Sequence, residues 1–129
     1  MDLNYLAVVV AAVAAFVASS AYYMSLGRQL ATLSPVYADA SRPPAWKVAQ
    51  EPVRNLIVAS VVAGLASLSE IADWTGTMGL ALALWIGFPV MLLAGSVIHE
   101  NVPWKLAAIH AGDWLMKLVI IAVIVGVWR

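Results

Sequence analysis

Apolar residues form four long runs along the chain, separated by short polar stretches. A helix of about 20 apolar residues is long enough to cross the hydrocarbon core of a bilayer. The pattern therefore predicts an all-α fold, an integral membrane four-helix bundle. The predicted spans cover residues 3–26, 53–71, 77–98 and 106–128. We expect residues 1–129 to form a single transmembrane domain.

Composition narrows the class of protein further. Hydrophobic residues make up 64% of the chain and charged residues only 11%, whereas soluble domains carry about 25% charged residues. A chain with this much apolar surface is expected to be embedded in a lipid bilayer, which is its predicted partner. The formal net charge is +0, which excludes a strongly basic protein that binds nucleic acid.

The longest polar stretch lies between the first two spans, at residues 27–52. Pro35, Pro43 and Pro44 fall within it, and proline interrupts regular helix. We therefore predict a loop here. Its first residues have the helical spacing that would let the first helix continue.

Basic side chains are distributed unevenly between the two ends of the predicted bundle. The first and third loops, with the residues beside them, hold Arg28, Arg42, Lys47, Arg54 and Lys105. The opposite end has Arg129 as its basic side chain. Cytoplasmic loops of membrane proteins carry the excess of Lys and Arg. The pattern predicts a multi-pass protein of the cell (inner or plasma) membrane, with the first and third loops cytoplasmic and both termini outside.

Small residues recur at helical spacing in three spans, where they let helix backbones approach closely in lipid. The first span holds Ala7, Ala11, Ala15, Ala18 and Ser19. The second holds two overlapping faces, Ser60, Gly64 and Ser67, and Ala59, Ala63 and Ser67. The third holds Gly79, Ala83, Gly87 and Gly95. We expect the third stripe to support a homo-oligomer, because four spans alone enclose little interior volume.

Pro89 lies inside the third span and leaves the carbonyl of Trp85 without its helical donor. A kink is expected at this position. The kink could act as a hinge, although a static kink is the interpretation that we favour.

Three ionisable residues of the fourth span share one helical face. His110, Asp113 and Lys117 are spaced i, i+3 and i+7, which places them on one side of a helix. Ionisable groups within a span are costly unless they face protein or water. We predict that this stripe faces the bundle interior. Plausible partners in the first span are Ser19, Ser20, Tyr22 and Tyr23.

Both ends of the chain contain motifs of a known family. They are Asn4-Tyr5-Leu6-Ala7-Val8-Val9-Val10-Ala11-Ala12, Tyr22-Tyr23 followed by Gly27-Arg28, His110-Ala111-Gly112-Asp113-Trp114-Leu115, and Gly126-Val127-Trp128. In these motifs the chain resembles the family known as domain of unknown function 1761. The members of that family are small bacterial membrane proteins. The turn Ser25-Leu26-Gly27-Arg28 departs from the bulkier aromatic form of that family. The resemblance implies a four-helix architecture over essentially the whole chain and no particular activity.

Two functions fit the polar stripe. In the first, His110, Asp113 and Lys117, with Tyr22 and Tyr23, line a path or binding site for a small solute, proton or cation. In the second, the same residues hold the helices of a structural or accessory protein together. The identity of a small-molecule ligand is left open by the sequence.

Catalytic and metal-binding motifs are missing from the sequence. It contains no nucleophile elbow, phosphate-binding loop or dinucleotide fingerprint. The spacing of His99, Glu100 and His110 matches no familiar metal site. We therefore expect a protein that is not an enzyme and has no metal and no cofactor.

Overall fold

A computed structural model describes residues 3–35 and 45–128, and this part of the chain folds into helices without a strand. The helices are α1 (Tyr5–Ser25), α2 (Gly27–Leu33), α4 (Ala45–Leu68), α5 (Trp74–Trp85), the π-helix η1 (Ile86–Val90), α6 (Met91–Glu100) and α7 (Trp104–Val127). The all-α prediction is confirmed.

Four helices are long and apolar enough to cross a membrane, as the sequence predicts. They are Tyr5–Ser25, Ala45–Leu68, Trp74–Glu100 and Trp104–Val127. The second differs most from its predicted span of 53–71, because α4 begins at Ala45 and contains Pro52. The residue four positions before Pro52 is Val48, which is exposed. The carbonyl that proline leaves without a donor is therefore not trapped in the core.

Part of the predicted loop at residues 27–52 is helical. Residues 27–33 form α2, and residues 45–52 form the first turns of α4. Pro43 and Pro44, like Arg42, lie outside the described residues, as does Arg129. Only the middle of the predicted loop therefore separates these two helices.

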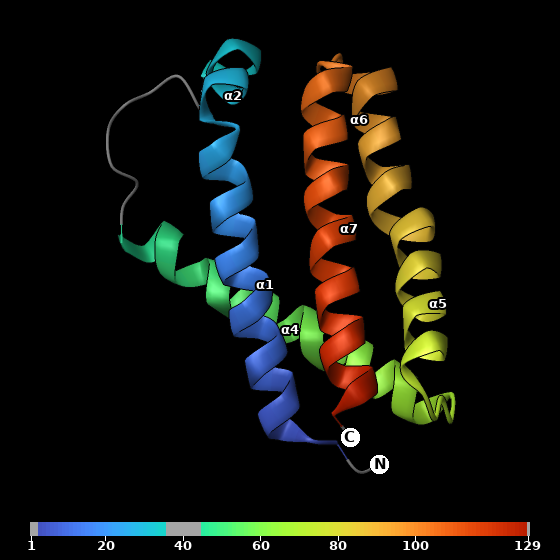
Figure 1. Ribbon diagram of the computed structural model, residues 1–129. Coiled ribbons are helices and arrows are strands. Elements are labelled where there is room, and N and C mark those ends of the chain that lie inside the picture. Colours follow the sequence, from blue (N-terminus) through green and yellow to red (C-terminus); the bar gives the residue numbers. More distant parts are fainter. Residues whose placement is uncertain (1–2, 36–44, 129) are drawn as a thin grey trace.

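α7 lies in the middle of the bundle, with α1 on one side and α5 with α6 on the other (Figure 1). α4 crosses behind α1 and α7 at a steep inclination. The first and last residues of the structure lie together at one end, where Asn4 Nδ2 donates to the Trp128 carbonyl oxygen at 3.4 Å. Four crossings thus bring the two ends of the chain to one side, as expected.

Pro89 lies within η1, between α5 and α6. The π-helix interrupts the regular α-helical hydrogen bonding, which is how proline inside a membrane helix is commonly accommodated. A π-helix thus lies where the sequence predicts a kink. It divides the third span into α5 and α6 without ending it.

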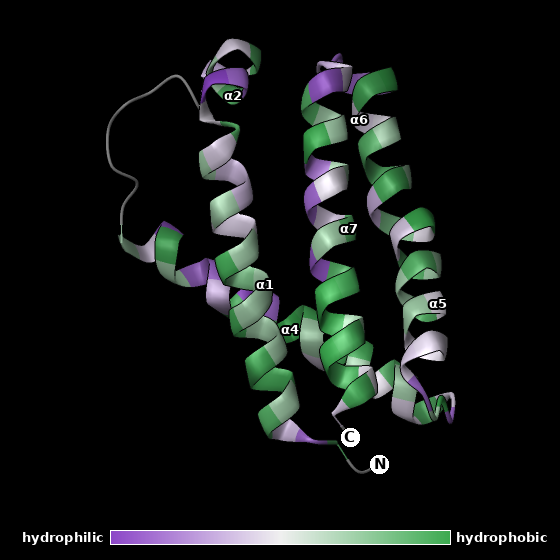
Figure 2. Ribbon diagram, viewed as in Figure 1, coloured by the Kyte–Doolittle hydropathy of each residue, from purple (hydrophilic) through white to green (hydrophobic). Residues whose placement is uncertain are grey.

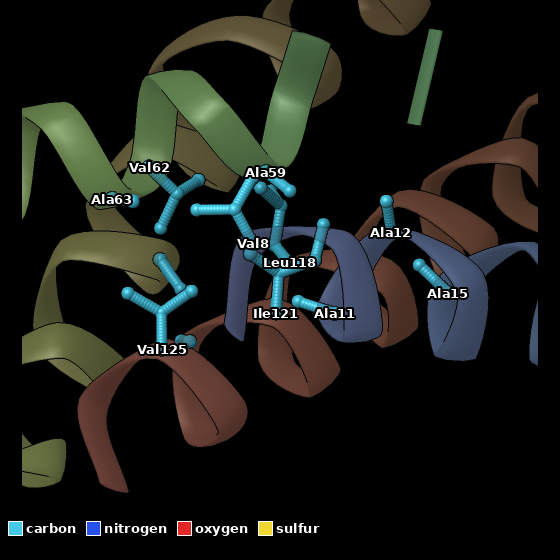
Figure 3. Close-up of a cluster of buried hydrophobic side chains, with 12 residues drawn as sticks. Val8, Ala11, Ala12, Ala15, Ala59, Val62, Ala63, Leu118, Ile121 and Val125 are labelled. Atoms are coloured by element: carbon cyan, nitrogen blue, oxygen red, sulfur yellow. The ribbon is translucent and has the colours of Figure 1, made fainter. Parts of the chain in front are cut away.

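The buried core is built mainly from alanine and β-branched residues (Figure 3). Its members are Val8, Ala11, Ala12, Ala15, Ala59, Val62, Ala63, Ala81, Leu118, Ile121, Ala122 and Val125. Small side chains let the helices approach closely, and this close packing replaces the hydrophobic effect that lipid does not supply. From the predicted stripe of the first span, Ala11 and Ala15 belong to this core. Ala7 and Ser19 are also buried, whereas Ala18 is only partly buried.

The small-residue faces of the other two spans have different surroundings. On α4, Ala59 and Ala63 are buried, whereas Ser60 is exposed. The expectation of a close-packing face through Ser60 and Gly64 is not met within the chain, because a Cβ on Gly64 would meet nothing within 4 Å. The stripe through Gly79 and Gly87 likewise faces open space.

Polarity follows this arrangement (Figure 2). Most of the helical surface is hydrophobic, and hydrophilic segments appear on the half of α7 near its start and at the beginning of α4. These two polar regions, far apart in sequence, belong to one site.

Candidate functional site

Asp113 and Lys117 form an ion pair inside the bundle. Asp113 Oδ2 lies 2.9 Å from Lys117 Nζ, and the two side chains are only 3% and 8% exposed. They are one turn apart on α7, with the acid first, which is the favourable order. Both lie near the middle of this helix of 24 residues, so a bilayer spanned by α7 would place the pair near its midplane.

Ser19 connects this pair to α1. Its Oγ donates a hydrogen bond of 2.6 Å to Asp113 Oδ1, and the bond is buried. Asp113 therefore uses one carboxylate oxygen for Ser19 and the other for Lys117. The carboxylate is held in place by two helices.

The Lys117 ammonium has a second neighbour on its own helix. Nζ lies 5.0 Å from the centroid of the Trp114 ring, within the range of a cation–π interaction. The lysine side chain thus lies between a carboxylate and an aromatic face.

The predicted tyrosine partners both reach α7. The Tyr23 hydroxyl lies 2.6 Å from His110 Nδ1, with the donor set by the histidine tautomer. The Tyr22 hydroxyl donates to the Ile109 carbonyl oxygen at 2.9 Å. Gly112 makes this second contact possible, because a Cβ at that position would lie 2.6 Å from the Tyr22 hydroxyl.

A cavity of about 600 Å³ adjoins this cluster. His110, Asp113 and Lys117 line it from α7, and Ser19, Ser20 and Tyr23 line it from α1. Tyr22 is not among the lining residues, since its hydroxyl is directed to the α7 backbone. The structure thus brings all five sequence-predicted residues together and places four of them on the cavity wall.

α4 supplies a charged wall that the sequence did not predict. Lys47, Glu51 and Arg54 line the cavity, and Arg54 Nη1 lies 2.9 Å from Glu51 Oε1. Their spacing of four and then three residues matches one helical face. This spacing could have predicted a charged helical face, but the nearby prolines indicated a loop.

α7 is also linked to the third span. Trp85 Nε1 donates to the Ala111 carbonyl oxygen at 2.9 Å, another contact that the sequence did not predict. Carbonyls of Ile109 and Ala111 thus accept bonds from two different helices. The polar half of α7 is fixed from both sides.

Metal ligands are not gathered in the part of the chain that the structure describes. No group of three His, Asp or Glu side chains there could hold a metal ion. His99 and Glu100 are exposed at the end of α6, whereas His110 lines the cavity.

The model of a family described as "Protein of unknown function (DUF1761)" matches residues 6–126, which is nearly the whole chain. No curated protein and no solved structure matches it. The matched region includes every residue of the candidate site and all of the four membrane-spanning helices except Tyr5 and Val127.

Proposed function

The chain belongs to the DUF1761 family of proteins of unknown function, and from the geometry of its site we propose that this multi-pass membrane protein binds and moves a small solute in the cavity between α1, α4, α6 and α7. The observation that carries the proposal is the Asp113–Lys117 ion pair, which is buried at mid-helix and yet lines a cavity of about 600 Å³. A charged side chain near the centre of a bilayer costs free energy, and the charged residues found there generally belong to substrate or ion pathways.

The lining of the cavity supports a solute rather than a bare proton or metal cation. Asp113 has both oxygens engaged, by Ser19 and by Lys117, so a cation would have to displace an existing partner. His110 and Lys117 instead offer polar edges to a molecule that carries its own donors and acceptors. The proposed role is binding and movement without catalysis.

A structural role is the second candidate, and a specific observation favours it. The bond from Ser19 to Asp113 and the bond from Tyr22 to Ile109 both join α1 to α7. Such bonds hold helices together in lipid, where each contributes about 1 kcal/mol. In this alternative the cavity is only a gap left between inclined helices and binds no ligand.

The proposed orientation places the first and third loops in the cytoplasm and both termini outside the cell membrane. Arg28, Lys47, Arg54 and Lys105 support it, because Lys and Arg accumulate on cytoplasmic segments. The charged cavity wall on α4 then belongs to the cytoplasmic half of the protein.

Thiol accessibility tests the proposed cavity. The chain has no cysteine, so Ser20→Cys introduces a single thiol into the cavity wall. A membrane-impermeant thiol reagent should modify it from the cytoplasmic side, because only a hydrated thiol forms the reactive thiolate readily. Ser60→Cys is the matched control, since Ser60 is exposed on the outer face of α4 and its thiol would face lipid.

The two candidate functions give different outcomes. A solute-binding cavity predicts that Ser20→Cys reacts several-fold faster than Ser60→Cys and is protected by solutes that occupy the site. Equal, slow modification of both variants in folded protein would contradict the binding proposal and leave the structural role.

A further inference from the structure

A second, apolar hollow adjoins the polar cavity. It has a volume of about 350 Å³ and lies over α5, η1 and α6, beside α7. Its lining includes Leu84, Phe88, Leu92 and Leu118, and no charged side chain contributes to it. Trp114 and Leu93 line both spaces, so the two share a boundary of just these side chains.

The inclination of α4 leaves this side of the bundle uncovered. α4 makes close backbone contacts with α1, α5 and α7, but it makes none with α6 in the described part of the chain. Leu93 of α6 nevertheless lines the same cavity as Lys47 and Arg54 of α4. The polar cavity is therefore bounded by α4 and α6 at positions where the two helices do not touch.

The polar cavity has an excess of positive charge. Lys47, Arg54 and Lys117 line it together with Glu51 and Asp113, which is three basic against two acidic groups. Arg54 and Lys117 are paired with the two carboxylates. The Lys47 ammonium lies 5.7 Å from the centroid of the Trp46 ring, and it is in no ion pair with a described carboxylate. A negatively charged group is the complement that this lining lacks.

We infer that the solute of this site is an anionic membrane amphiphile, whose headgroup occupies the polar cavity and whose chain lies in the apolar hollow. The inference rests on the proposed binding function and names its ligand class. Lys47 and Arg54 attract the acidic headgroup, and Lys117 donates a hydrogen bond at its inner end. Trp114 and Leu93 contact the junction of head and chain. A wholly water-soluble anion would leave the apolar hollow unused.

Site-directed photo-crosslinking tests the ligand class. The photoreactive residue p-benzoylphenylalanine is placed at Phe88, which lines the hollow, or at Ile86, which is exposed on the same turn and lies outside it. Each variant is reconstituted in phosphatidylcholine vesicles that contain a minor fraction of phosphatidylglycerol with the same chains. Mass spectrometry then identifies the attached lipids. We expect adducts at position 88 to be several-fold enriched in phosphatidylglycerol and adducts at position 86 to match the bilayer composition.

Two lysines provide a matched pair for the headgroup. Lys47 lines the cavity beside Trp46, whereas Lys105 stacks in the same way on Trp104, at 5.9 Å, and does not line the cavity. Lys47→Gln should lower the enrichment at position 88 several-fold, and Lys105→Gln should leave it unchanged. Equal effects of the two substitutions would overturn the assignment of the headgroup to this cavity.

The remaining outcomes separate this inference from the proposed function. The adducts at both positions could instead have the same lipid composition as the bilayer while Ser20→Cys is modified rapidly. That result would overturn the assignment of an anionic amphiphile and leave a site for another solute. Slow modification of Ser20→Cys in vesicles of phosphatidylcholine alone, where no anionic amphiphile can protect the thiol, would overturn the proposed function and the amphiphile with it.

Discussion

At the scale of single residues, the Asp113–Lys117 pair is both costly and well satisfied. Removing two charges from water is expensive, and their attraction offsets this only where further hydrogen bonds complete the geometry. Ser19 supplies such a bond to Asp113, and the Trp114 ring lies beside the lysine. The pair therefore depends on all its partners being present.

Removing one member of the pair should destabilise the fold. Asp113→Ala leaves the ammonium of Lys117 buried without its carboxylate, and we expect a loss of about 3 kcal/mol in the free energy of unfolding. Thermal unfolding in detergent micelles measures this loss. Ser19→Ala removes only one neutral donor and should cost about 1 kcal/mol.

A double substitution is the control for this prediction. Asp113→Ala combined with Lys117→Met removes both charges and should regain most of the lost stability, because no unpaired charge remains. If the double variant is as unstable as Asp113→Ala, packing rather than charge accounts for the loss.

The contacts among these residues could be foreseen only in part. His110, Asp113 and Lys117 were predictable because helical periodicity on one element fixes which side chains share a face. Residue type and position alone pointed to the candidate partners on α1, which were Ser19, Ser20, Tyr22 and Tyr23. Tyr23 contacts Nδ1 of His110, and Tyr22 donates to a backbone carbonyl. These contacts depend on how α1 is rotated about its axis relative to α7, which sequence periodicity does not specify.

At the scale of helices, the end of α7 approaches the start of α5 closely. A Cβ on Gly126 would lie 2.7 Å from Trp74 Cα and 3.0 Å from Thr77 Oγ1. The first of these atoms belongs to backbone, so the contact cannot be relieved by a change of rotamer. This glycine sets the distance between the two helices.

Gly126→Ala should therefore force α5 and α7 apart. Overpacking of this kind costs about 1–3 kcal/mol, and we expect a corresponding drop in the thermal unfolding midpoint. Gly64→Ala is the matched control, because its new methyl group meets nothing within 4 Å and alanine is the better helix former. A Gly126→Ala protein as stable as Gly64→Ala would refute the close-packing role.

The course of α4 is the element that the sequence predicted least well. Prolines normally mark the start of a helix or its end, so Pro43 and Pro44 predicted a loop, and the second span was predicted to begin only at residue 53. In the structure the helix continues through Pro52, and this extension carries Lys47 and Glu51 to the cavity wall. The charged wall was missed for that reason.

At the scale of the whole molecule, the four spans followed directly from the lengths of the apolar runs, because bilayer thickness fixes how long a spanning helix must be. The packing of these helices did not follow. Crossing angles depend on how side-chain ridges fit between neighbours, and the inclination of α4 that exposes the cavity results from such a fit. The architecture was thus predictable and the cavity was not.

The outer face of the third span has a stripe of small residues that the chain itself does not cover. Gly79, Ala83 and Gly87 are exposed, and added Cβ atoms at the two glycines would meet nothing within 4 Å. Within a bilayer, such a stripe lets a second helix approach closely and gain packing energy that lipid chains provide less well. We therefore predict self-association of the protein along this stripe.

Gly87→Leu should weaken that association, because a branched side chain in the stripe holds the partner helix away. Cross-linking in membranes at native protein density measures the dimer fraction. Gly64→Leu adds the same bulk to α4, at a glycine where an added Cβ likewise meets nothing within 4 Å, and should leave the dimer fraction unchanged. A wild-type protein that remains monomeric would refute self-association, whereas equal loss in both variants would place the contact elsewhere. Because the stripe lies on α5 and η1, which also border the apolar hollow, a partner seated there would help to enclose the ligand chain.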